Sequence, residues 1–119
     1  MYKNWPGMTG ELSPALRELR MGAPEPMKAF SGLAKAALEP KALDTKTKEL
    51  IAFAISVATR CDACVGFHAE AAVKQGASRD EILETMAMAI YMGAGPSVMY
   101  AAQALEAFDQ FAAKKQAAE

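Results

Sequence analysis

Both cysteines and the only histidine of this 119-residue chain fall within eight residues, in the segment CDACVGFH at positions 61–68. At 100° per residue, Cys61, Cys64 and His68 share about a 60° arc of one helix face. A thiol is a useful nucleophile only as a thiolate, and a helix N-terminus with a nearby basic group lowers its pKa from about 8.5 into the ~3.5–7.5 range. The segment therefore favours thiol chemistry in which His68 takes the proton of Cys64, and Cys61 closes a disulfide with it.

Charged residues around this segment are further candidates. Glu49 lies twelve residues before Cys61 and could hold or relay the proton of His68, although acidic residues in a first helical turn commonly serve the helix dipole. Asp62 disfavours a second negative charge nearby, and it could instead cap the helix. Arg60 could offset the charge of Asp62, or it could bind the last carbonyls of the preceding helix.

Three other interpretations of the cysteine pair need to be weighed. The two cysteines could simply be small buried residues, because free cysteine is often buried. Cys61, Cys64, His68 and Glu49 could bind zinc, but structural zinc sites usually add a second Cys or His pair, which this chain lacks. A thioredoxin-type site is excluded because no βαβ pattern accompanies the motif.

Composition predicts one globular domain over residues 1–119, with a core of about 25–113. The chain has 13 basic and 14 acidic residues and a net charge of −1, so no basic patch for nucleic acid is expected. The start shows no apolar signal segment, and the longest apolar run, 50–58, is roughly half the ~20 residues of a membrane span. We therefore expect a cytoplasmic protein, where a cysteine pair is more often catalytic or metal-binding than structural.

The pattern along the chain predicts an all-α fold of about six helices. Alanine fills 26 positions, and β-branched residues never alternate with polar ones. Start and stop signals include Ser13-Pro14, Asp44 or Thr45, Gly76 and an S-x-x-E capping box at Ser78 and Glu81. The predicted helices cover about 13–22, 26–38, 45–58, 62–75, 79–92 and 96–115, with a turn at Arg60-Cys61 and a break at 93–96. The second should bury Met27, Phe30, Leu33, Ala34, Ala37 and Leu38.

The helix over residues 50–58 is apolar all round, which is typical of a helix surrounded by protein. A bundle this small cannot easily enclose it, and the fifth helix offers Met86, Met88, Tyr91 and Met92 on several faces. These patterns predict a homo-oligomer with helices packed across subunits.

The spacing Glu49, eleven residues, Cys61-x-x-Cys64, three residues, His68 resembles the active-site signature of the alkylhydroperoxidase D-like group of the carboxymuconolactone decarboxylase family. The resemblance extends to the segments at 46–52 and 92–97, to Tyr100 and to 104–106. It covers roughly residues 40–110.

The resemblance implies an all-helical fold in trimers or hexamers, and peroxide or disulfide reduction without a bound cofactor. Cys64 would be the peroxidatic thiol, Cys61 the resolving thiol, and His68 with Glu49 the proton relay. The partners would be a small hydroperoxide or disulfide and an external dithiol reductant. The chain departs from the pattern at Ala63, where alkylhydroperoxidase D has a further relay histidine, so a slower peroxidase or a general disulfide reductase is the expectation. True decarboxylases of the family typically lack the cysteine pair. A non-enzymatic redox sensor stays open, and only turnover with a supplied dithiol separates it from an enzyme.

Overall fold

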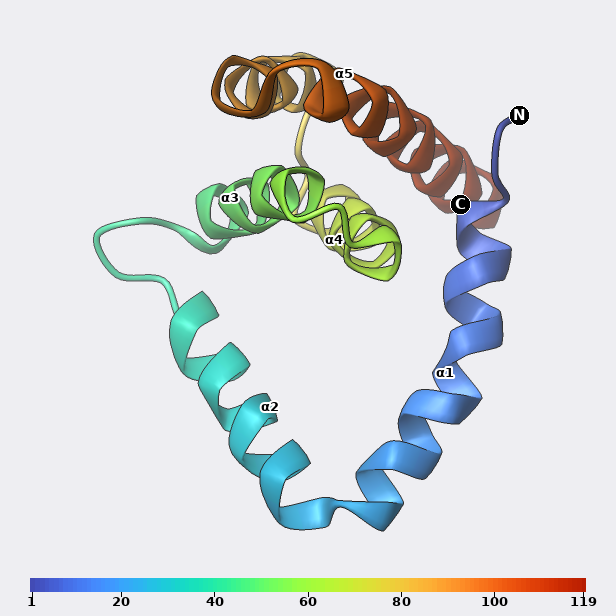
Figure 1. The fold of residues 1–119 in the computed structure, drawn as a ribbon, viewed down its shortest axis with the longest axis vertical. Coiled ribbons are helices and arrows are strands. Elements are labelled where there is room, and N and C mark those ends of the chain that lie inside the picture. Colours follow the sequence, from blue (N-terminus) through green and yellow to red (C-terminus); the bar gives the residue numbers. More distant parts are fainter.

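The computed structural model describes residues 1–119 and contains five α-helices and no strand, which confirms the predicted all-α class (Figure 1). The helices are α1 (Trp5–Gly22), α2 (Pro24–Leu38), α3 (Thr45–Ala58), α4 (Asp62–Lys74) and α5 (Arg79–Ala118). The predicted caps at Asp44 and Ser78 are present, since Asp44 accepts from the Thr47 amide and Ser78 forms a capping box with Glu81.

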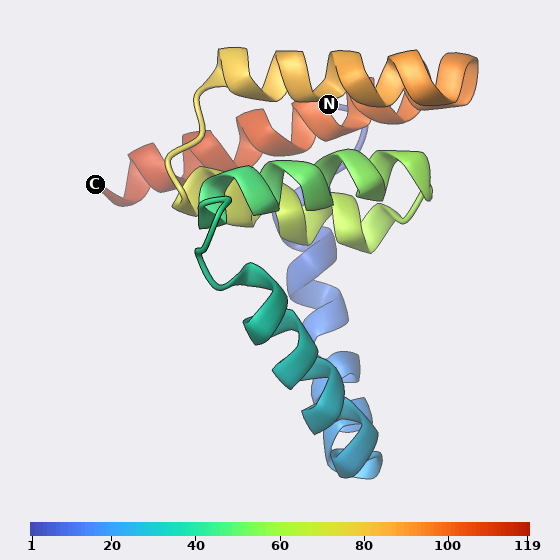
Figure 2. The same ribbon diagram turned by 90° about the vertical axis from the view of Figure 1, so that its left-hand side faces the viewer.

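The last two predicted helices are joined as the two parts of α5. The backbone leaves the helical region at Ala94, with φ of 54° and ψ of −143°. The chain reverses its direction there, and the two parts run back beside each other (Figure 2). Residues from both parts, including Leu83 and Leu105, line one apolar pocket. Gly93 permits this reversal, because a Cβ at Gly93 would lie 1.9 Å from Oγ of the buried Ser97.

The core lies among α3, α4 and α5, which pack closely against one another. Phe53 and Val57 from α3 and Val65 from α4 are fully buried, and Phe108 from α5 is nearly so. Helix α1 closes one side of this core through Trp5, which has no exposed surface. Helices α3 and α4 are neighbours joined by a short turn, and they run in opposite directions (Figure 2). This arrangement brings Glu49 of α3 into contact with His68 of α4.

The predicted start of the first helix at Ser13-Pro14 is wrong. Helix α1 begins at Trp5, with the Asn4 side chain accepting from the Gly7 amide. Pro14 lies inside the helix, and the hydroxyl of Ser13 donates to the Thr9 carbonyl at 2.8 Å. A Ser-Pro pair is compatible with a helix start, but the burial of Trp5 against the core favours the earlier cap at Asn4.

The predicted burial of the second helix is also wrong within the single chain. No residue of α2 is buried, and Phe30 and Leu33 are each 63% exposed. Helices α1 and α2 form a V that projects from the core (Figures 1 and 2). On α3, which was expected to be enclosed, Ile51 and Ile55 are 45% and 55% exposed. Despite these exposed apolar side chains, no helix has the length and apolarity needed to cross a membrane.

Candidate thiol redox site

The turn between α3 and α4 delivers the cysteine pair. The Arg60 amide donates to the Val57 carbonyl and the Cys61 amide to the Ser56 carbonyl, which together form a Schellman motif. Arg60 takes the left-handed position of this motif, with φ of 56°, where glycine is usual. The predicted turn at Arg60-Cys61 is therefore present. The positive φ of a non-glycine residue costs about 1–2 kcal/mol, so backbone strain is concentrated next to the cysteines.

Cys61 caps helix α4. Its Sγ accepts a hydrogen bond from the Cys64 amide at 3.3 Å, and the cap residue has an extended backbone. The two cysteines form a disulfide, with their Cα atoms 5.2 Å apart. The alternative in which Asp62 caps the helix is wrong, because Asp62 is the first residue of the helix and Cys61 is its cap. Both sulfur atoms thus lie at the positive end of the helix dipole, which favours thiolate once the disulfide is reduced.

Glu49 and His68 meet across the interface between α3 and α4. His68 Nδ1 lies 3.1 Å from Glu49 Oε1, and the Glu49 side chain is only 9% exposed against 33% for His68. A buried carboxylate is costly unless it is paired, and the imidazole is its partner. With Nδ1–H donating to the carboxylate, Nε2 is the ring nitrogen that can accept a proton. The structure therefore brings Glu49 and His68 together, and it places His68 one helical turn after Cys64.

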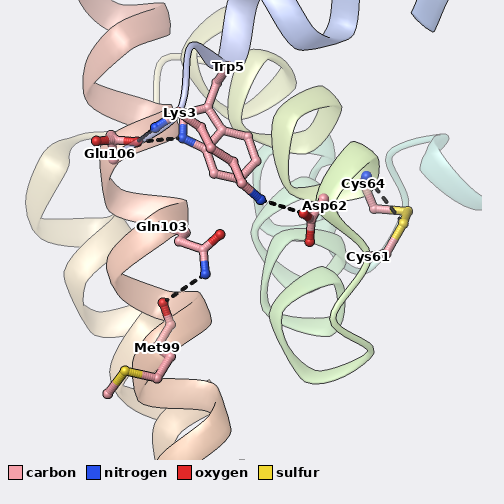
Figure 3. Close-up of polar contacts among 8 residues, drawn as sticks. All are labelled: Lys3, Trp5, Cys61, Asp62, Cys64, Met99, Gln103 and Glu106. Carbon is pink, nitrogen blue, oxygen red and sulfur yellow. Dashed lines mark hydrogen bonds and ion pairs between the residues drawn. A yellow bond between two sulfur atoms is a disulfide. The ribbon is translucent and has the colours of Figure 1, made fainter. Parts of the chain in front are cut away.

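Asp62 pairs with a residue that sequence reasoning missed. Lys3 Nζ lies 2.5 Å from Asp62 Oδ2, and the two side chains are 30% and 38% exposed (Figure 3). The hydrogen bond from Lys3 holds the pKa of Asp62 below its ordinary value, and the hydrogen bond to Asp62 raises the pKa of Lys3. Hydrogen bonding to Asp62 also raises the pKa of Tyr100 on α5. No local pattern in the sequence predicts this contact, because 59 positions separate Lys3 from Asp62.

Hydrogen bonds to the backbone fix the N-terminal arm, the short segment before α1 that contains Lys3. Glu106 on α5 accepts from the Tyr2 and Lys3 amides at 2.6 and 2.9 Å and from the Trp5 indole at 2.8 Å. These bonds hold the pKa of Glu106 below its ordinary value, with the Tyr2 amide as the main cause. Gln110 donates to the Lys3 carbonyl at 2.7 Å. The arm is thereby held along α5, beside the first turn of α4 (Figure 3).

Gln103 lies on the same side of α5. Its Nε2 donates to the Met99 carbonyl at 3.3 Å, whereas its Oε1 is buried without a hydrogen-bond partner. Figure 3 shows the amide pointing from α5 toward the space beside Lys3 and Asp62. Nowhere in the chain do three or more His, Cys, Asp or Glu side chains lie together in a way that could hold a metal ion.

The chain thus combines an all-helical fold with a CxxC disulfide at a helix N-terminus and a histidine bound to a buried glutamate. Residues 24–107 match the sequence profile described as the carboxymuconolactone decarboxylase family. The chain belongs to this family, and its alkylhydroperoxidase D-like motif is consistent with that membership.

Relatives and solved structures agree with this assignment. An uncharacterized protein of Haemophilus influenzae is 42% identical over 108 residues, covering 91% of this chain and 96% of its own. A carboxymuconolactone decarboxylase family protein from Legionella pneumophila, in its apo form, superposes with a TM-score of 0.89 at 52% identity, covering 91% and 96% of the two chains. A family protein from Thermotoga maritima, for which a role in antioxidative response has been suggested, gives a TM-score of 0.83 at 28% identity, covering 94% and 96%.

Proposed function

We propose that this protein is a thiol-dependent oxidoreductase of the alkylhydroperoxidase D type, which reduces hydroperoxides or disulfides with the Cys61–Cys64 couple. The disulfide between these residues at the N-terminus of α4 is the observation that carries the proposal. The Glu49–His68 pair supplies a base one turn away. The suggested antioxidative role of the Thermotoga maritima relative points to the same class of activity.

The oxidative half of the cycle begins with the Cys64 thiolate. It attacks the terminal oxygen of a hydroperoxide, the O–O bond breaks, and the alcohol leaves with a proton that His68 supplies. Cys64 is then a sulfenic acid. The Cys61 thiol attacks its sulfur, the S–S bond forms and water leaves. Two electrons have passed from the thiols to the peroxide.

The reductive half requires an external dithiol, which this structure does not identify. We propose that its thiolate attacks Sγ of Cys64, so that Cys61 is the leaving group. The Cys64 amide that donates to Cys61 Sγ at 3.3 Å stabilises this leaving thiolate, and a better-stabilised thiolate leaves faster. The second thiol of the reductant then attacks the mixed disulfide, which returns Cys64 to its reduced form and leaves the reductant as a disulfide.

The reduced protein, mixed with a small excess of hydroperoxide, tests the proposal when peroxide and free thiols are followed together. We expect two thiols to disappear per peroxide within seconds to minutes, and repeated turnover when dithiol is supplied. Loss of thiols only over hours would exclude peroxidase activity. A single oxidation of the cysteine pair without repeated turnover would indicate a redox sensor.

Two matched serine variants test the role of each cysteine. Cys64→Ser should abolish the reaction with peroxide, because the attacking thiolate is gone. Cys61→Ser should leave a sulfenic acid on Cys64 that dimedone traps, because no thiol resolves it. The reverse pattern would exchange the two roles.

We also propose that the protein works as a homo-oligomer, a trimer or hexamer. Helix α2 buries no side chain within its own chain, and its Phe30 and Leu33 are exposed. On α5, Met88, Tyr91 and Met92 are exposed by 59%, 78% and 77%. Apolar faces of this extent commonly mark protein contacts, and further copies of the chain would cover them.

A further inference from the structure

The first turn of α4 contains an acid that opposes the proposed chemistry. Asp62 lies between the two cysteines, and a carboxylate near a thiol disfavours the thiolate. Asp62 follows Cys61 directly and precedes Cys64 by two residues, so its charge lies within the same first turn of α4 as both cysteines. The proposed nucleophile therefore needs a compensating positive charge.

Lys3, near the N-terminus of the chain, supplies this positive charge. The Lys3 ammonium contacts Asp62 at 2.5 Å and lies 5.2 Å from the centroid of the buried Trp5 ring. Lys3 is not a loosely attached surface residue, because its backbone amide is bound by Glu106 and its carbonyl by Gln110. Because the backbone of Lys3 is already held, the pair with Asp62 has to order only the Lys3 side chain.

We propose that Lys3 is a positioning residue for the cysteine pair: it is held beside α4 by the N-terminal arm, neutralises Asp62 and so favours ionisation of the Cys64 thiol. The inference rests on the proposed thiol chemistry of Cys64. Lys3 acts through Asp62 and need not touch the substrate. The arm before α1 thereby becomes part of the redox site, although it lies outside the residues 24–107 that match the family profile.

The other ionisable groups around the pair do not replace Lys3. His68 lies on α4 itself and is engaged by Glu49 of α3. Arg60 precedes Cys61 and has no ion pair with Asp62, whereas the Tyr100 phenol of α5 stays neutral because Asp62 raises its pKa. Lys3 is thus the cation bound to Asp62, and its removal should leave that carboxylate uncompensated.

The test measures ionisation of Cys64 in full-length protein that carries Cys61→Ser, so that one thiol remains. The rate of alkylation by iodoacetamide is followed from pH 5 to pH 10. Lys3→Met should slow alkylation at pH 6 about three- to tenfold, as expected when a nearby carboxylate loses its counter-charge in a largely hydrated environment. Lys3→Arg keeps the charge and should stay within about twofold of the parent.

Asp62→Asn separates this electrostatic role from a structural one. If Lys3 acts through Asp62, the double variant with Lys3→Met and Asp62→Asn should return to within about twofold of the parent rate. An unchanged rate in Lys3→Met, or a double variant as slow as Lys3→Met alone, would overturn the inference. Both side chains are partly exposed, and helical circular dichroism confirms that each variant is folded. Because alkylation does not require peroxide, the experiment tests the role of Lys3 whether or not the protein turns over peroxide.

Discussion

Helices α1 and α4 approach each other closely at Gly66. A Cβ at this position would lie 2.7 Å from Thr9 Cγ2, which no real contact tolerates, and 3.6–3.7 Å from Met8 and Trp5. Gly66→Ala should therefore push α1 away from α4. Because α1 follows directly from the arm that carries Lys3, the same displacement would disturb the contact with Asp62.

Two opposing terms set the size of the effect. Alanine in place of glycine inside a helix stabilises by about 1 kcal/mol, whereas overpacking of a filled interface costs about 1–3 kcal/mol. We expect Gly66→Ala to lower the free energy of unfolding by about 1 kcal/mol, or the Tm by about 4 °C for a domain of this size. Urea and thermal unfolding at fixed protein concentration measure both quantities.

Two variants sharpen this prediction. Gly10 lies inside α1 with nothing within 4 Å of its Cβ position, so Gly10→Ala should stabilise the protein by about 0.5–1 kcal/mol. Thr9→Ser removes the clashing methyl but keeps the hydroxyl that donates to the Trp5 and Pro6 carbonyls. In that background Gly66→Ala should also become stabilising. If Gly66→Ala alone stabilised the protein as Gly10→Ala does, the packing of α1 on α4 would be refuted.

Three further predictions follow from the site and from the exposed faces. Glu49→Gln keeps the size of the side chain but removes the charge that orients His68, so peroxide consumption should fall about ten- to a hundredfold; steady-state rates with saturating dithiol measure this, and a rate within twofold would contradict the relay. Phe30→Lys places a charge on the exposed face of α2 and should reduce the mass found by light scattering, whereas an unchanged oligomer would exclude this face from the interface. The pKa of Asp62 is lower in the folded protein than in the unfolded chain. The Asp62–Lys3 pair therefore stabilises the fold at pH values above the unfolded-state pKa of about 3.9, and this stabilisation is lost as the pH falls through the folded-state pKa. Lys3→Met should therefore reduce the difference in unfolding free energy between pH 7 and pH 3 by up to about 1 kcal/mol, a small value because both side chains are about one-third exposed. If urea unfolding showed the same loss of stability at pH 3 in Lys3→Met and in the parent protein, this prediction would be wrong.

Local signals in the sequence were sufficient to predict most of the helices. Asp44, Gly76, Ser78 and Glu81 act on backbone groups three or four residues away, so their caps could be found without any tertiary contact. Cys64 and His68 lie one helical turn apart on α4 for the same reason, whereas Cys61 is the N-cap residue and lies just outside the helix. Glu49 was a candidate from its position before Cys61, the resemblance to the alkylhydroperoxidase D-like signature supported it, and the structure places it against His68.

The sequence by itself determined the all-α class, the turn that bears the cysteines and the side chains available for thiol chemistry, because these depend on the period of the helix and on neighbouring residues. Only the tertiary structure decided where α1 begins, which face of α2 stays uncovered, and that Lys3 reaches Asp62 across 59 positions. Those features depend on which surfaces meet after the chain has folded back on itself. Neither helical periodicity nor capping patterns encode such long-range contacts.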